Sequence, residues 1–372
     1  MNEIFNDINE LKESKKIAIA VSGGIDSLSL VFLANNWCKE NNIKVIGITV
    51  DHGLRKSSND EAVYINSLLK QHNIEHHILV WEGKKPSNNV ESIAREARYK
   101  LIFDFCRENN IKTILLGHHL QDQAENFLIR LFRGSGILGL SSMQKISHID
   151  EFTIIRPFLN IKKEDLREYL IKNNIEWVED ESNTDEKYLR NKIRNFLNSF
   201  EEKDNIVKRI NVATETFQAA ENIIKNKIQD LENEIYSYNK KYNYYTVNYK
   251  KFLNLEKDFQ LRIISKIAKN ISDNVYNPRL TKLERLLNEL KNLKKYTFYN
   301  CVFEKISDGE FVCYKEYNSL KNKELYLPKG QLNQFLQNLK KNNIKKYNEI
   351  KNFRGYKREI LYTIPIKELE ND

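Results

Sequence analysis

The sequence lacks any long apolar stretch. No uninterrupted apolar run reaches about 18 residues, the length that a membrane span needs. The N-terminal segment MNEIFNDINELKESKK is acidic and amphipathic, without the basic region and apolar block of a secretory signal. We therefore expect no membrane association and a cytoplasmic location.

Cysteine is also scarce, and its four positions are scattered: Cys38, Cys106, Cys301 and Cys313. They form no CxxC pair, and no histidine stands at a spacing that suits zinc. We interpret all four as structural thiols rather than as metal ligands or redox groups. The chain likewise has no internal repeat and no long linker rich in proline or glycine.

Length and charge set further bounds. The 372 residues exceed the size at which a single core usually stops growing, so two or three domains are expected. Apolar residues make up 41% of the chain, which is enough for ordinary globular cores. The net charge of +9 fits a polyanionic partner, but it also fits a genome with a biased base composition. Charge alone therefore does not show that the chain binds a polyanion.

Apolar runs alternate with helical patterns in the first half of the chain. The runs stand at residues 15–21, 43–50, 75–81, 111–117 and 152–158. The helical segments begin near Ser27, Ser58, Asn89, Gln121 and Lys162. Runs rich in Ile and Val, joined by helices, are typical of parallel strands buried on both faces. We predict a doubly wound α/β fold with a parallel five-stranded sheet, whose ligand lies beyond the carboxyl ends of the strands.

The first run leads into SGGIDS, residues 22–27. Gly23 and Gly24 allow a tight turn whose N–H groups approach an anion, and the N-terminus of the next helix favours negative charge there. Ser22 and Ser27 add hydroxyl groups. Asp26 fits beside phosphates when Mg²⁺ lies between them. The pattern indicates a phosphate-binding turn.

A plain strand–turn–helix with a glycine turn and a serine cap is the other interpretation of this hexapeptide. The segment matches neither the GxxxxGK loop nor the GxGxxG fingerprint. A P-loop NTPase and a dinucleotide dehydrogenase are therefore disfavoured.

Together with four later blocks, this turn carries a family resemblance. SGGIDS resembles the SGGxDS pyrophosphate loop of PP-loop ATP pyrophosphatases, which cleave ATP between the α and β phosphates to adenylate a substrate. The later blocks are VDHGLR (50–55), ESIAREARY (91–99), LGHHLQDQAENFLIRLFRGSG (116–136) and EDESNTDEKYLRNKIR (179–194). In this order the five blocks closely resemble tRNA(Ile)-lysidine synthetases, over about half of the chain.

The resemblance implies both ligands and site residues. ATP and Mg²⁺ are the expected cofactors, and the residues expected to bind ATP are Ser22, Gly23, Gly24, Ile25, Asp26, Ser27, Val50 and His52. The expected catalytic residues are Asp26, Arg98, His118 and Asp122, of which Asp26 and Asp122 are the expected metal ligands. Contacts to tRNA are expected from Arg55, Arg133, Ser135, Arg190, Asn191 and Arg194.

Several of these residues also have ordinary interpretations. Arg98 flanks a helical apolar stripe and is compatible with a solvated surface position. The two histidines of GHHLQDQAEN lack HExxH spacing, so a zinc site is disfavoured and His119 is interpreted as a core histidine. Gln121 stands where relatives often have an acidic residue, so no charged role is expected for it. Arg133 and its neighbours suit a helix C-cap. The charges of residues 190–194 also suit a surface helix.

The acidic and polar residues expected to recognise the amine substrate, which carries positive charge, are Asp180, Ser182, Asn183 and Asp185.

The second half is less specific. Helices are predicted at residues 205–238, 256–270, 281–292 and 331–341, and short strands in YTFYNCVFEKI and EFVCYKEY. Residues 340–358 mix lysine and arginine with aromatic residues, which suits RNA, although a solvated basic face fits as well. We predict a catalytic domain at 1–200, a helical linker and tRNA-binding domain at 201–295, and a small basic α+β tRNA-binding domain at 296–372.

The resemblance implies that free lysine is ligated to carbon 2 of the wobble cytidine in an isoleucine tRNA with a CAU anticodon, and it allows a homodimer. Another adenylating PP-loop enzyme, such as a tRNA thiolase or an amide ligase, is the alternative within the superfamily. A non-catalytic RNA-binding protein is the alternative from a different class. The sequence contains all four expected catalytic residues, which disfavours a non-catalytic protein: Asp26, Arg98, His118 and Asp122.

Overall fold

The computed structural model describes residues 2–53, 58–82, 90–179, 189–272, 274, 278–292, 294–320 and 322–370. The chain divides into two compact units, residues 1–222 and 223–372. This boundary falls inside helix α9 (Lys203–Ile235). The three-part division at residues 200 and 295 stays a prediction.

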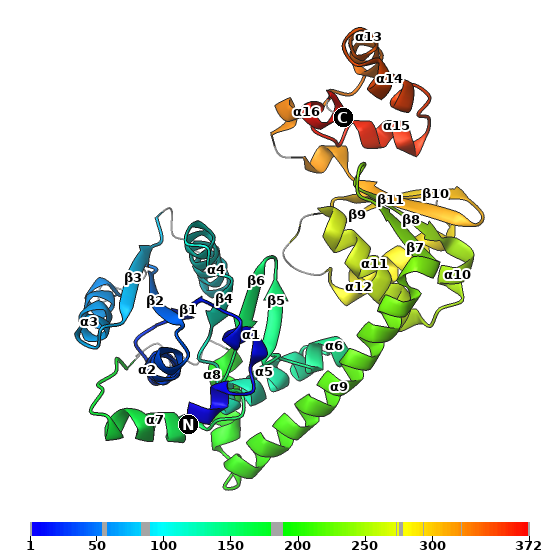
Figure 1. Ribbon diagram of the computed structural model, residues 1–372. Coiled ribbons are helices and arrows are strands. Elements are labelled where there is room, and N and C mark those ends of the chain that lie inside the picture. The colour runs from blue at the N-terminus through cyan, green and yellow to red at the C-terminus, as the bar shows by residue number, and fades with distance from the viewer. Residues whose placement is uncertain are drawn as a thin grey trace. The chain divides into compact units, whose positions relative to one another are not determined.

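The first unit contains a six-stranded sheet in the order β3-β2-β1-β4-β6-β5 (Figure 1). The strands are β1 (Lys16–Ala20), β2 (Lys44–Asp51), β3 (Glu75–Val80), β4 (Thr113–Leu115), β5 (Ile146–Ile149) and β6 (Phe152–Ile155). Five of them are parallel, as predicted, and β5 pairs antiparallel with β6. The sheet therefore has one more strand than the sequence indicated.

Helices cover both faces of this sheet. They are α2 (Ile25–Glu40), α3 (Ser58–Gln71), α4 (Val90–Glu108) and α7 (Lys163–Lys172), whereas α5 (Leu120–Phe132), which follows β4, packs in a core made of helices. All five helices begin within two residues of the predicted starts. In β1, Ile17 and Ile19 pack in a core with α2, α3 and α7, whereas Ala18 packs in a second core with α4. Burial on both faces explains why the strands are continuously apolar. The remaining helices are η1 (Asn2–Phe5), α1 (Asn9–Lys12), α6 (Ile137–Leu140) and α8 (Leu189–Asn198).

The second unit is built on an antiparallel sheet in the order β7-β8-β11-β10-β9. Its strands are β7 (Tyr236–Asn239), β8 (Tyr244–Asn248), β9 (Lys295–Phe298), β10 (Cys301–Ser307) and β11 (Glu310–Lys315). Its helices are α10 (Tyr249–Leu253), α11 (Lys257–Ser272), α12 (Leu280–Asn292), α13 (Leu332–Asn342), α14 (Ile344–Ile350), α15 (Tyr356–Leu361) and α16 (Ile366–Glu370). Short 3₁₀ turns, η3 (Tyr317–Ser319) and η4 (Lys323–Leu325), complete it.

Alternate side chains of the strands in this second sheet pack in two different cores. Phe303 and Phe311 pack with α11 and α12, whereas Val302 and Val312 pack with the C-terminal helices. The two-residue period of a strand produces this division. The helix predicted to reach Tyr238 ends at Ile235, because the chain continues there as β7.

The four cysteines are buried and free, as predicted. Burial raises the pKa of Cys38 and of Cys106 to about 12, so both thiols stay protonated at neutral pH. Within the described part of the chain, no helix combines the length and the apolar character that crossing a membrane requires.

Candidate active site

The turn between β1 and α2 is stabilised by hydrogen bonds of a serine hydroxyl within it. Ser27 Oγ accepts from the N–H of Ser22 at 3.0 Å and donates to the carbonyl oxygen of Gly24 at 3.1 Å. Gly24 is the N-cap of α2, with extended backbone and no side-chain cap. The first N–H groups of α2 are therefore directed at the space beyond the turn, where an anion is favoured.

Gly23 permits this turn through its backbone. Its φ of +84° lies in the region that side chains disfavour. A Cβ at this position would also lie 2.8 Å from Ile65 Cδ1. At Gly24, by contrast, the nearest atom to an added Cβ is Ser22 Oγ at 3.9 Å. The two glycines therefore differ, and only Gly23 is required by its backbone conformation.

A second strand end packs against this turn. An added Cβ at Gly117, which follows β4, would lie 2.9 Å from the carbonyl oxygen of Asp26. The close approach brings His119, the N-cap of α5, to Asp26, with 3.6 Å between His119 Nε2 and Asp26 Oδ1. His119 Nδ1 accepts from the N–H of Asp122, and Asp122 Oδ2 accepts from the N–H of His119 at 3.0 Å. The predicted core histidine thus lies between the two predicted catalytic carboxylates, Asp26 and Asp122.

The residues at this point fit a hard cation such as Mg²⁺. Asp26 Oδ1 is buried and has no hydrogen-bond partner. Burial raises the pKa of Asp26, which means that the ionised carboxylate lacks solvation. The described residues contain no group of three or more His, Cys, Asp or Glu side chains in a metal-binding arrangement. Mg²⁺ commonly binds through one or two carboxylates together with phosphate oxygens, so Asp26 and Asp122 suffice.

His118 is held neutral. Burial is the main reason that its pKa is lowered to about 3. The charge of Asp122 acts in the opposite direction, whereas the guanidinium groups of Arg156 and Arg95 lower the pKa further. Its Nδ1 is buried without a hydrogen-bond partner. A neutral imidazole with a free ring nitrogen offers a hydrogen bond to a substrate without adding positive charge.

Arg98 and His52 meet at the neighbouring strand ends. Arg98 Nε donates to His52 Nε2 at 3.3 Å. His52 follows β2, and its ring contacts Trp81 edge-on, with 6.2 Å between the ring centroids. Val50 lies within β2, partly buried against the core that contains α4. These residues were predicted from separate blocks, and the sheet brings Arg98 and His52 together at its carboxyl edge.

Ion pairs join α8 to α5. Arg190 Nε donates to Glu125 Oε2 at 2.6 Å, and its Nη2 donates to Asp122 Oδ1. Arg194 Nε donates to Glu125 Oε1 at 2.7 Å. Burial opposes ionisation of Asp122, yet the charges of His119 and Arg190 outweigh it and lower the pKa of this carboxyl. Asn191 is buried on the same helix.

The other predicted contacts lie apart from this cluster or outside the described residues. Arg133 and Ser135 follow the far end of α5, about 17 Å from Asp122 at the rise of an α-helix. Arg55 falls outside the described residues, as do the four expected to recognise the amine: Asp180, Ser182, Asn183 and Asp185. The tRNA-binding roles of all these residues stay predictions.

Sequence reasoning missed three residues of the site: Gly117, Glu125 as an ion-pair partner, and Arg156. Arg156 directly follows β6 and is buried, with Nη1 donating to the carbonyl oxygen of Gln144 at 3.0 Å and Nε without a partner. An arginine at the end of an apolar run was the signal that could have revealed it. For Gly117 the signal was a glycine at a strand end, and for Glu125 there was none.

A protein-family model described as the PP-loop domain matches residues 1–201. Among solved structures, the U34-tRNA thiolase NcsA from Methanococcus maripaludis has a TM-score of 0.49 and 20% identity, covering 57% of this chain and 77% of that chain. That likeness is too low to bear on function.

Curated relatives match more of the chain. The tRNA(Ile)-lysidine synthase of Wolbachia pipientis wMel is 35% identical over 290 residues, 77% of this chain and 67% of the relative. That of Orientia tsutsugamushi is 32% identical over 389 residues, 96% of this chain and 88% of the relative. That of Rickettsia conorii is 47% identical over 182 residues, 49% of this chain and 38% of the relative. With the PP-loop domain in its first half and a relative matched along almost its whole length, the chain belongs to the tRNA(Ile)-lysidine synthase family.

Proposed function

We propose that this protein ligates free lysine to carbon 2 of the wobble cytidine in an isoleucine tRNA with a CAU anticodon, forming lysidine. ATP is consumed and AMP and pyrophosphate are released. The observation that carries the proposal is the meeting of Asp26, His119 and Asp122 beside a glycine turn that directs helix N–H groups outward. This arrangement suits a triphosphate whose α–β bond is broken.

The reaction has two steps. The oxygen on carbon 2 attacks the α phosphorus of ATP, and the bond from that phosphorus to pyrophosphate breaks. The amine of lysine then attacks carbon 2, the carbon–oxygen bond breaks, and AMP leaves. Adenylation replaces a poor oxide leaving group with a good one, which makes the substitution feasible.

Several features of the turn and of the neighbouring strand ends have a part in the first step. The N–H groups at the start of α2 bind pyrophosphate oxygens and stabilise the charge that develops there. Arg98, positioned by His52, adds a guanidinium to the same charge. Asp26 and Asp122 would hold Mg²⁺, which supplies charge neutralisation to the phosphates when bound.

The second set of groups concerns the tRNA. His118, neutral at the working pH, presents a hydrogen-bonding nitrogen to the cytosine ring rather than a cation. Arg133 and Ser135 are proposed to contact tRNA beyond the cytidine. For Arg190 and Arg194 the same role requires that their pairs with Glu125 leave part of each guanidinium accessible. A cytoplasmic location and a homodimer stay predictions.

AMP and pyrophosphate release tests the proposal, with transcribed CAU isoleucine tRNA and lysine each omitted in turn. We expect AMP only with tRNA, more of it with lysine, and a loss of at least about a hundredfold in Asp26→Ala and Arg98→Ala. AMP formation with a different acceptor, and none with this tRNA, would retain the ATP chemistry and refute the substrate. No ATP turnover with any tRNA would favour a non-catalytic RNA-binding protein.

A further inference from the structure

Arg156 is a buried cation at the carboxyl edge of the parallel sheet. It directly follows β6, and only 8% of the residue is exposed. Its Nη1 donates to the carbonyl oxygen of Gln144 at 3.0 Å and to Ser147 Oγ at 2.9 Å. Its Nε is buried and has no partner. Among the residues that the structure describes, no carboxylate pairs with this guanidinium group, so its charge is not neutralised within the chain.

A second arginine lies beside Arg156 and is also without a carboxylate partner in the described part of the chain. Arg95, on α4, donates from Nη2 to the hydroxyl of Tyr99 at 3.4 Å, and its Cζ lies 5.2 Å from the centroid of the Tyr99 ring. Burial lowers the pKa of Arg156. The hydroxyl of Tyr99 opposes this effect, whereas the charge of Arg95 adds to it. Two positive charges thus lie close together, with a neutral phenol beside both.

Arg107, on the same helix as Arg95, shows the contrast. Its guanidinium group pairs with Asp104 at 2.9 Å and with Glu151 at 2.7 Å, although all three side chains are largely exposed. Water would solvate that cation even without its partners. Arg156 has little access to water and no carboxylate, and a buried charge in that position is costly unless an anion binds it.

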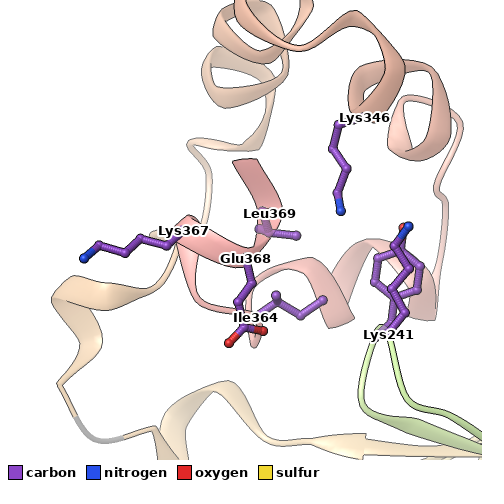
Figure 2. A pocket seen from close by; sticks show the side chains of 7 residues that line it. Lys241, Lys346, Ile364, Lys367, Glu368 and Leu369 are labelled. Atoms are coloured by element: carbon purple, nitrogen blue, oxygen red, sulfur yellow. The ribbon is translucent and has the colours of Figure 1, made fainter. Parts of the chain in front are cut away.

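The cavity of about 300 Å³ in the second unit offers no comparable charge. Figure 2 shows its lining, which includes Lys241 and Lys346. Lys241 donates to Glu349 at 2.9 Å, and Lys346 has a partner as well. The cations of this cavity are therefore satisfied within the protein, unlike the arginine that follows β6.

The two arginines lie next to His118. Strand β4 pairs with β6, with Leu115 opposite Ile155, so His118 and Arg156 follow neighbouring strand ends. Burial lowers the pKa of His118, and the charges of Arg156 and Arg95 lower it further, as expected for side chains that are close in space. His118 is proposed above to bind the cytosine ring. An anion bound by these arginines would therefore lie beside the reactive base.

A phosphate group is the anion that suits this site, because a guanidinium group can donate two parallel hydrogen bonds to phosphate oxygens. Its position favours tRNA over ATP as the source. Strand β4 separates β1 from β6, which puts the ends of β1 and β6 about 10 Å apart. The N–H groups proposed to bind pyrophosphate follow β1. In a displacement at phosphorus the attacking and leaving oxygens lie in line, so the acceptor approaches from the side opposite the pyrophosphate.

We propose that Arg156 and Arg95 bind a backbone phosphate of the tRNA next to the wobble cytidine, with Tyr99 beside both guanidinium groups. The bound phosphate holds the backbone of a nucleotide whose base has to leave the anticodon stack to reach His118. The choice of tRNA rests on the proposed function, whereas phosphate binding by these arginines does not. A phosphate of ATP shares the chemistry, and the experiment distinguishes the two sources.

The test compares Arg156→Gln and Arg95→Met with Arg107→Met, the matched control that removes one arginine charge from α4. Affinity for transcribed CAU isoleucine tRNA is measured by filter binding over a series of salt concentrations. We expect about tenfold weaker binding in Arg156→Gln and about fivefold weaker binding in Arg95→Met, each with a salt slope reduced by about one. Arg107→Met binds tRNA like the unmodified protein. Affinity for ATP, measured by equilibrium dialysis, stays unchanged in all three variants.

A neutral linkage in the RNA identifies the phosphate. Full-length tRNA is assembled by ligation with a methylphosphonate on the 5′ or on the 3′ side of the wobble cytidine. One of these two tRNAs should bind the unmodified protein about tenfold more weakly than ordinary tRNA, yet bind Arg156→Gln no more weakly than ordinary tRNA does. A purely structural role of Arg156 would not produce this coupling, because the two losses would then add.

The remaining outcomes decide against the contact. Losses that add for both linkages refute a phosphate next to the cytidine, and equal affinities for tRNA and ATP in both variants refute the site. Weaker ATP binding with unchanged tRNA affinity assigns the phosphate to ATP. Thermal unfolding checks the fold, and if Arg156→Gln does not fold, Arg95→Met decides by the same readouts. A chain that makes no AMP with this tRNA, yet shows the coupled loss of affinity, refutes the proposed function and keeps the site.

Discussion

At the residue scale, Gly23 and Gly24 look alike in the sequence but carry different constraints. Gly23 has a φ of +84°, and an added Cβ would lie 2.8 Å from Ile65 Cδ1. Gly24 has a φ of −78°, and an added Cβ there would lie no closer than 3.9 Å to its nearest neighbour, Ser22 Oγ. The phosphate-binding turn therefore depends on one glycine for its shape.

Replacing each glycine by alanine tests this difference. We expect Gly23→Ala to lose about 1–3 kcal/mol of unfolding free energy, through the strained backbone, and to bind ATP poorly because the turn shifts. Gly24→Ala is the matched control and retains stability. Urea unfolding and the KM for ATP measure the two effects. Equal losses in both variants would contradict the assignment.

Asp26 links stability to pH at the same scale. Burial raises its pKa in the folded protein above the ordinary value of 3.8, so the unfolded chain releases this proton at lower pH than the folded protein does. As pH rises through that window, ionisation favours the unfolded chain, and the folded protein loses stability that it does not regain at higher pH.

Asp26→Asn removes this ionisation. Without ATP and with EDTA present, we expect the variant to unfold at higher urea concentration than the unmodified protein at neutral pH. The difference should vanish at about pH 3, where the carboxyl is protonated in both states. AMP formation falls at least about a hundredfold in the same variant. A variant less stable at neutral pH would show that the carboxylate is already well solvated or paired.

At the element scale, α8 is held on α5 by Glu125. The 2.7 Å pair of Glu125 with Arg194 equals in length the 2.7 Å pair of Glu151 with Arg107. The two carboxylates differ in burial, since the Glu125 side chain is 5% exposed and the Glu151 side chain is 43% exposed, and Glu125 also accepts from Arg190. Buried charged hydrogen bonds matter more, because a lost partner there is not replaced by water.

Glu125→Gln and Glu151→Gln compare the buried carboxylate, which pairs with Arg190 and Arg194, with an exposed one. We expect Glu125→Gln to lower the free energy of unfolding by about 2 kcal/mol, whereas Glu151→Gln changes it by less than about 0.5 kcal/mol. Urea denaturation of both variants provides the values. A similar small change in both would mean that water reaches Glu125 as readily as it reaches Glu151.

The same elements show how far sequence reasoning extends. The five parallel strands were predictable from their apolar runs. Burial on both faces explains those runs in β1, β2, β4 and β6, whereas β3 is only half-buried. Strand β5 was not predictable, since ISHI is short and only half-buried. Strands β7 and β8 were missed because they follow α9 without a break in polar and aromatic composition.

The contacts of charged residues in the candidate site were harder to predict from the sequence than the strands were. Arg190 pairs with Glu125, 65 residues earlier in the chain, so nothing local distinguishes it from a surface arginine. By contrast, Asp26, Arg98 and His52 follow strand ends or flank a helix stripe, and the topology of a parallel sheet brings such positions together.

At the scale of the whole molecule, the two compact units have separate cores. Phe158 is fully buried in the first unit, and Phe303 is fully buried in the second. Each core is assembled from elements of its own unit, so each unit can lose its packing without emptying the other core.

Calorimetry tests this independence. We expect two thermal transitions. Phe158→Ala lowers the free energy of unfolding of the first unit, and Phe303→Ala that of the second, each by about 3–5 kcal/mol, so each variant moves one transition to lower temperature. Each variant serves as the control for the other. A single transition that both variants shift equally would show that the chain unfolds as one cooperative body.

Helix α9 runs through the division between the units, from Lys203 to Ile235, with Lys225 and Lys227 just past the boundary. Domains are commonly joined by extended, exposed linkers, which proteases cut first. Here the peptide bonds at the junction are hydrogen-bonded within a helix, and a protease needs an unfolded stretch of backbone to bind. Trypsin therefore meets its two nearby lysines in a form that it cleaves slowly, so the units are not released from each other by a first cut at their boundary.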